Sequence, residues 1–134
     1  MLKPELEIHS ARNTWSSPQE IHFRVSKITR QWTAQPHLWA PPTDLSETDS
    51  EYMIRIEIAG IQEAEINIAV ENQQLAIYGL RQPPSGQGAY HRLEVRFGDF
   101  MSVVELPGEF EVDGIKADYR DGFLLVTVPK EGGR

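Results

Sequence analysis

The sequence predicts an all-β fold, a β-sandwich, preceded by a partly helical N-terminal arm. The first observation is a period of two, because apolar and polar residues alternate in short runs after residue 41. Such runs turn one face to a core and the other to water, as antiparallel strands do. The second is that turn-forming residues, and no helical pattern, separate the runs. The third is a change of composition near residue 42, which divides the chain into an arm (1–40), a β domain (41–130) and a short tail (131–134).

Length and composition exclude several classes of protein. The 134 residues suit one domain with a modest extension. The absence of cysteine excludes disulfide scaffolds, thiol nucleophiles and cysteine zinc sites. A net charge of −7 argues against nucleic acid as a partner, since phosphate binding needs clustered basic residues.

No segment of the sequence is apolar for long enough to cross a membrane. The longest apolar stretches resemble residues 123–126, whereas a membrane-spanning helix needs about twenty such residues. Lys3, Pro4 and Glu5 interrupt the N-terminus before any apolar stretch. We therefore expect no signal peptide and a cytoplasmic protein.

The arm contains a predicted helix. Ser17 is a suitable N-cap, Pro18 suits the first turn, and Glu20 completes a capping box. The apolar residues that follow are spaced four, three and four apart, which places them on one helical face: Ile21, Val25, Ile28 and Trp32. Phe23 lies off this face and leaves open a strand through residues 21–25. We favour the helix, with its end near Pro36.

An isolated helix of about fifteen residues is marginal in water, so this one needs a partner surface. It either packs on its own domain or belongs to a mobile arm that docks on other subunits and on exposed apolar surface. The arm also differs from the rest in charge and aromatic content. Residues 1–42 carry a net charge of +2 and all three tryptophans, whereas residues 43–134 carry −9.

The alternating runs of the β domain define the expected strands. In chain order their apolar members are Ile54, Ile56 and Ile58; Ile66, Ile68 and Val70; Leu75 and Ile77; Leu93 and Val95; Phe100, Val104 and Leu106; Ile115, Ala117 and Tyr119; Leu124, Val126 and Val128. Turn residues at 59–60, 71–72, 83–86 and 107–108 separate these runs. The pair Asp121-Gly122 predicts a short hairpin.

Several segments together resemble the alpha-crystallin domain of small heat-shock proteins. Its first half is similar to the segments 58–61, 66–70 and 75–81, its middle to 90–100 and Glu105-Leu106-Pro107, and its closing signature to 117–124 and 126–130. The resemblance covers about ninety residues and keeps the order of the motifs.

The resemblance implies an immunoglobulin-like sandwich that dimerises and an ATP-independent holdase, a chaperone that binds partly unfolded client proteins. It implies a dimer-exchange strand in the loop 82–98: Leu93, Glu94, Val95 and Arg96. It implies a groove that takes a tail or a client: Ile66, Ile68, Val70, Ile115 and Ala117. Most of the area of these side chains is expected to be plain core, with only their edges at the open side of the sandwich available. The arm residues that we expect to bind clients are Ile21, Val25, Ile28, Trp32 and Trp39.

The sequence departs from the family pattern at two places. Family members carry basic residues in the strand that ends at Leu106-Pro107, whereas residues 102–105 read Ser-Val-Val-Glu here. This difference removes the basic partners of the ion pairs that the family makes between subunits. The residues after Pro129 also lack the two aliphatic residues, one apart, that plug the groove of a neighbouring dimer. We therefore expect dimers or low oligomers, unless the arm supplies the plug.

The sequence offers no sign of catalysis, cofactor binding or metal binding. The four histidines, His9, His22, His37 and His91, are too widely spaced for a compact ligand set. The segment 86–88 is too short to cradle a phosphate and opens no helix. We expect no enzyme, cofactor or metal. The alternative to a holdase is an interaction module or co-chaperone adaptor of related sandwich fold, which would lack a strand at residues 93–95.

Overall fold

The computed structural model describes residues 6–7, 24–27, 38–62, 66–86 and 88–132. The chain order of the elements is β1 (Leu6–Glu7), β2 (Arg24–Lys27), β3 (Thr43–Glu47), β4 (Glu51–Glu57), β5 (Asn67–Glu71), β6 (Gln74–Arg81), β7 (Gly98–Glu105), the short 3-10 helix η3 (Val112–Gly114), β8 (Lys116–Arg120) and β9 (Phe123–Pro129). The prediction of an all-β sandwich is confirmed.

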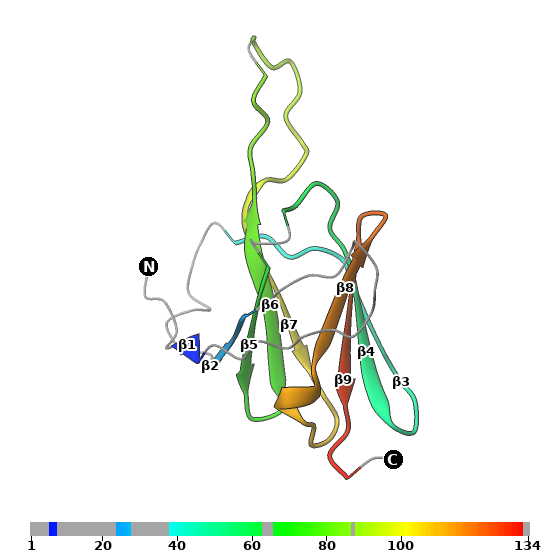
Figure 1. Cartoon of the computed structure of the whole chain (residues 1–134). Helices are drawn as coiled ribbons and strands as arrows, with labels where there is room; N and C mark the ends of the chain where they lie inside the picture. Colours follow the sequence, from blue (N-terminus) through cyan, green and yellow to red (C-terminus); the bar gives the residue numbers. More distant parts are fainter. Residues whose placement is uncertain (1–5, 8–23, 28–37, 63–65, 87, 133–134) are drawn as a thin grey trace.

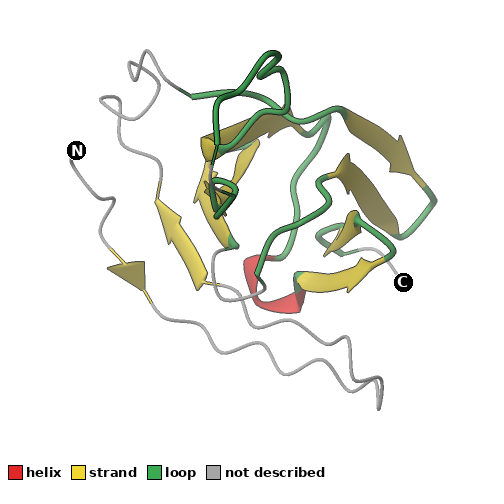
Figure 2. Ribbon diagram, turned by 90° about the horizontal axis from the view of Figure 1, so that it is seen from above, coloured by secondary structure: helices red, strands yellow, loops and turns green. Residues whose placement is uncertain are grey.

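The strands form two sheets that face each other (Figure 1). One sheet has the order β1-β2-β5-β6-β7, and the other has the order β3-β4-β9-β8. All pairings are antiparallel except that of β2 with β5, which is parallel. Seen from above, the strands of the two sheets lie on opposite sides of the core (Figure 2).

The core consists of the inward-facing members of the alternating runs. Their side chains form one buried cluster that includes Ile54, Ile56, Ile58, Ile66, Ile68, Leu75, Ile77, Phe100, Leu106, Ile115, Leu124, Val126 and Val128. Each of these is at most 1% exposed. Their neighbours along β4, Arg55 and Glu57, are exposed, as the period of two predicts.

The predicted hairpin at Asp121-Gly122 is confirmed, since it joins β8 to β9. Asp121 has φ of 52° and Gly122 has φ of 82°, so both turn residues are left-handed. This conformation suits the right-handed twist of the paired strands. A Cβ at Gly122 would lie 3.1 Å from Cβ of Ala59.

The predicted helix of the arm is wrong at Arg24–Lys27, which form β2. These residues pair in parallel with β5, and Val25 lies opposite Ile68. The free edge of β5 gives the backbone of β2 hydrogen-bond partners, whereas a short isolated helix gains little in water. The tertiary contact therefore overrides the local period. The rest of the predicted helix, including Ile21, Ile28 and Trp32, lies outside the described residues.

The strand β3 is an element that sequence reasoning missed. It pairs with β4 from Thr43 to Glu47. Leu45 is its only large apolar residue, so the segment shows no alternation of apolar and polar side chains. An edge strand buries little, and its sequence is accordingly polar.

Gly122→Ala should destabilise the sandwich by about 1–2 kcal/mol, because a Cβ is strained at positive φ and crowds Ala59. Urea unfolding of the two chains measures this difference. Gly86→Ala is the matched control, since Gly86 has open space around it and no positive φ. Equal stability of the two variants would contradict the assigned turn.

Candidate functional site

The loop between β6 and β7, residues 82–97, is the most exposed apolar part of the described chain. It carries four exposed large side chains: Tyr90 (54% exposed), Leu93 (56%), Val95 (77%) and Phe97 (40%). The loop stands out from the ends of β6 and β7 (Figure 1). Its described residues, 82–86 and 88–97, contain no strand, so the strand expected at Leu93 and Val95, which was to exclude a co-chaperone adaptor, is not formed within the single chain. A soluble chain exposes several large apolar side chains together where it binds something.

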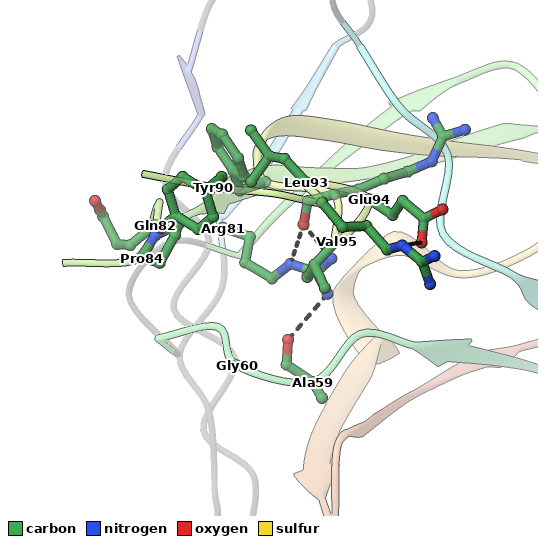
Figure 3. A pocket seen from close by; sticks show the side chains of 12 residues that line it. Ala59, Gly60, Arg81, Gln82, Pro84, Tyr90, Leu93, Glu94 and Val95 are labelled. Atoms are coloured by element: carbon green, nitrogen blue, oxygen red, sulfur yellow. Dashed lines mark hydrogen bonds and ion pairs between the residues drawn. The ribbon is translucent and has the colours of Figure 1, made fainter. Parts of the chain in front are cut away.

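The loop surrounds a shallow apolar groove of about 500 Å³. Ala59 and Gly60, which follow β4, form one side of the groove, and Pro84, Leu93 and Val95 form another. Figure 3 shows Tyr90, Leu93 and Val95 around the side chain of Arg81. The predicted exchange residues Leu93, Glu94, Val95 and Arg96 are therefore together, exposed and without a strand partner within the described chain.

Arg81 is a residue that sequence reasoning missed. It is the last residue of β6 and lies opposite Gly98, the first residue of β7. Its guanidinium donates to the carbonyls of Arg96 and Ala59. The sequence indicates only that Arg81 ends a predicted strand. It gives no sign of these hydrogen bonds, because both acceptors are backbone atoms of distant residues.

The edge of the second sheet is open at β3. Among the described residues, β3 pairs only with β4. Leu45 lies opposite Ile54 and is 40% exposed, so it continues the inward face of the sheet to its rim. Lys130 donates to Glu47 at 2.7 Å. The hydrogen bond to this carboxylate raises the pKa of the Lys130 amine.

An inter-sheet hydrogen bond joins β3 to β7. The hydroxyl of Thr43 lies 2.6 Å from that of Ser102 and donates to the carbonyl of Pro41 at 3.0 Å. Since the Thr43 hydrogen is engaged, Ser102 is the donor of the shorter bond. Ser102 is 6% exposed. Ser102, which lies in the strand segment that departs from the family pattern, thus faces inward and bonds to the edge strand β3.

The predicted groove residues lie in the core. Ile66, Ile68, Ile115 and Ala117 are at most 1% exposed, and Val70 is partly buried. The first four are core, as expected for most of their area, and in this conformation their side chains expose no edge to a tail or a client. The edge of β5 beside them is paired with β2 of the same chain.

Trp39 is also a correction. It is 9% exposed and belongs to the core of the sandwich, not to a client-binding arm. Its backbone pairs with β7 around Phe100, and Met101 donates to its carbonyl at 2.9 Å. The ring centres of Trp39 and Phe100 lie 5.8 Å apart. Val25 lies in β2, and the other expected arm residues, Ile21, Ile28 and Trp32, lie outside the described part of the chain.

Within the described residues, no three histidines or carboxylates gather in a way that could hold a metal ion. No described helix is long and apolar enough to span a membrane.

Comparisons with known proteins agree with this geometry. The family model of the Hsp20/alpha crystallin family matches residues 44–134. Small heat shock protein C2 of Rickettsia felis is 37% identical over 93 residues, which cover 68% of this chain and 60% of that protein. A 19.0 kDa class II heat shock protein of Oryza sativa is 32% identical and covers 85% of this chain and 71% of its own length. The crystal structure of hspA from Xanthomonas axonopodis has a TM-score of 0.64 at 28% identity, over 72% of this chain and 98% of that one.

The described sandwich is therefore an alpha-crystallin domain. The chain belongs to the Hsp20/alpha crystallin family of small heat-shock proteins, which are ATP-independent chaperones and not enzymes. Its match to the Rickettsia protein spans less than two thirds of that protein's length.

Thr43→Val should destabilise the chain by about 1–2 kcal/mol, because it leaves the buried Ser102 hydroxyl without an acceptor. The double variant Thr43→Val with Ser102→Ala should recover part of this loss, since no unpaired hydroxyl remains. Unfolding in urea of the two single variants and the double variant measures the coupling. Additive losses would show that the two hydroxyls do not interact.

Proposed function

We propose that this chain is a holdase that dimerises by strand exchange and binds partly unfolded proteins without ATP. The observation that carries the proposal is the loop 82–97, which exposes Leu93 and Val95 on the sandwich of a chaperone family. A partner must cover this apolar surface. An open sheet edge on a second copy of the chain is the partner that the fold itself supplies.

The alternation of the exchange residues matches the edge at β3. In an extended strand, Leu93 and Val95 share one face, and Glu94 and Arg96 share the other. On β3, Leu45 lies on the inward face, whereas Asp44 and Ser46 lie on the outward face, opposite the exposed Arg55 and the half-buried Met53. A strand added to this edge would place its apolar face on the core side and its charged face in water.

The energies favour such an addition. Each fully buried Leu or Val side chain stabilises the association by roughly 1.5–3 kcal/mol, and the backbone of the exchanged strand gains hydrogen bonds with β3. The expected dimer contains two equivalent exchanges, so each of these contributions occurs twice.

Leu93→Pro should give monomers with an intact sandwich, since proline cannot donate to the strand ladder. Mass measurement by light scattering, with circular dichroism for the fold, tests this. Ser85→Pro is the matched control, because it places proline in the same exposed loop outside the exchange residues. A Leu93→Pro chain of unchanged dimer mass would mean that another edge is used.

Client binding is assigned to the arm and to the edge that it covers. The apolar residues of the arm include Ile21, Val25, Ile28 and Trp32, of which Val25 lies in β2. The four-residue strand β2, flanked on its outer side by only the two-residue β1, opens before the sandwich does. Its release on warming would uncover the β5 edge and free Val25 for a client. Covering the apolar surface of an unfolding client is worth about 25 cal/mol per Å².

The charge of the β domain supports the same function. Residues 43–134 carry a net charge of −9, which would keep a complex with an apolar client in solution. Binding of the unfolded state lowers its free concentration and so slows aggregation.

Deletion of residues 1–37, which keeps Trp39 in the core, should leave a folded β dimer with little ability to suppress aggregation. Alanine at Val25, Ile28 and Trp32 together should cause most of the same loss. Light scattering of a heat-labile client without nucleotide measures suppression, and circular dichroism checks the fold. Full suppression by the shortened chain would place client binding on the sandwich. No suppression by the complete chain would favour a non-holdase interaction module.

A further inference from the structure

Arg81 joins four segments that are far apart in the sequence. It ends β6, and its Nε donates to the carbonyl of Arg96 at 2.7 Å on the returning side of the loop. A second guanidinium nitrogen, Nη2, also donates to Arg96, and Nη1 donates to the carbonyl of Ala59 at 3.2 Å (Figure 3). The guanidinium carbon lies 4.4 Å from the centre of the Trp39 ring.

These contacts meet at the neck of the exchange loop. The pair Arg81 and Gly98 is the last of the β6–β7 ladder, so beyond it the two sides of the loop have no strand pairing. Beyond this pair, the Arg81 side chain joins the two sides of the loop through its hydrogen bonds to the carbonyl of Arg96. It also fixes this neck against the turn after β4 and against Trp39, where the arm enters the sandwich.

We propose that Arg81 is the positioning residue of the exchange loop: it sets the direction in which residues 93–96 leave the sandwich and ties that direction to the docking of Trp39. This inference rests on the proposed strand exchange. A loop held at its neck loses less conformational freedom when its tip pairs with a second subunit.

Arginine suits this position in a way that lysine does not. The planar guanidinium presents donors in a fixed fork, so it can bind two carbonyls and stack on an indole at once. A lysine ammonium can keep the charge over Trp39 but cannot reproduce the fork. Among the described residues, the buried indole N–H of Trp39 has no hydrogen-bond partner, and Arg81 adds a cation–π contact to the core packing that holds this ring.

The test is the dissociation constant of the dimer, measured by sedimentation over a dilution series of the full chain. Arg81→Met should weaken the dimer about tenfold or more, because a loop that is no longer held at its neck loses more conformational freedom when its tip pairs with a second subunit. Arg81→Lys should lie between Arg81→Met and the unchanged chain. Arg92→Met is the matched control, since it removes the same charge from an 82% exposed side chain, whose ion pair with the 75% exposed Glu94 is long at 3.9 Å and contributes little. It should leave the dissociation constant within about twofold.

A second readout follows Trp39 in chains that carry Trp15→Phe and Trp32→Phe. Emission of the remaining tryptophan should shift to longer wavelength in Arg81→Met. The same shift should occur when Arg81→Met is introduced into the Leu93→Pro monomer, because the contact lies within one chain. Urea unfolding checks that the sandwich remains folded. If Arg81→Met does not fold, Arg81→Lys takes its place as the test variant in both measurements.

The outcomes separate the two proposals. If Leu93→Pro gives monomers but both Arg81 variants dimerise as tightly as the unchanged chain, the positioning role is wrong and strand exchange stands. If Arg92→Met weakens the dimer as much as Arg81→Met does, charge and not position is responsible, and the inference also fails. If Leu93→Pro remains dimeric, strand exchange is wrong, and the inference falls with it.

Discussion

Contact between the inward faces of the two sheets is the interaction on which the rest of the structure depends. Ile54, Ile56 and Ile58 from one sheet meet Ile68 and Ile77 from the other, and none of these is exposed. Each buried side chain of this size stabilises the fold by roughly 1.5–3 kcal/mol. Because side chains alternate along a strand, the same packing turns every second residue to water. It thereby leaves the strand edges and the β6–β7 loop as the places where the chain can meet another molecule.

The two sheets of this sandwich differ in whether the edge strand has a partner. The edge of β5 is paired with β2 from the same chain, whereas β3 ends its sheet with Leu45 partly exposed. Open edges are a risk for most proteins, since they pair with other chains. In a small heat-shock protein the same property is useful. In the proposed function, a covered edge that can be released and an open edge that takes a partner strand would provide client binding and assembly from one fold.

Much of the fold could be read from short-range pattern. The runs around Ile54, Leu75 and Leu124 predict strands because burial on one face requires a period of two, and Asp121-Gly122 predicts its turn because both residues tolerate positive φ. The order of the motifs was specific enough to indicate the family. The strands and the turn depend on neighbouring residues alone, so a short stretch of sequence is enough to predict them.

The candidate site depends on contacts between distant segments more than the strands and turns do. The periodicity of the arm favours a helix, but Arg24–Lys27 form a strand because the edge of β5, more than forty positions away, supplies their backbone partners. Trp39 resembles the other arm tryptophans in sequence, yet its pairing with β7 places it in the core. The bond between Thr43 and Ser102 and the bridge from Arg81 to Ala59 and Arg96 leave no local pattern. The sequence by itself thus determined which residues face inward and which turns join them, since both follow from neighbouring side chains. Only the tertiary structure decided which edges are paired and what holds the loop, because those contacts exist only after distant strands have met.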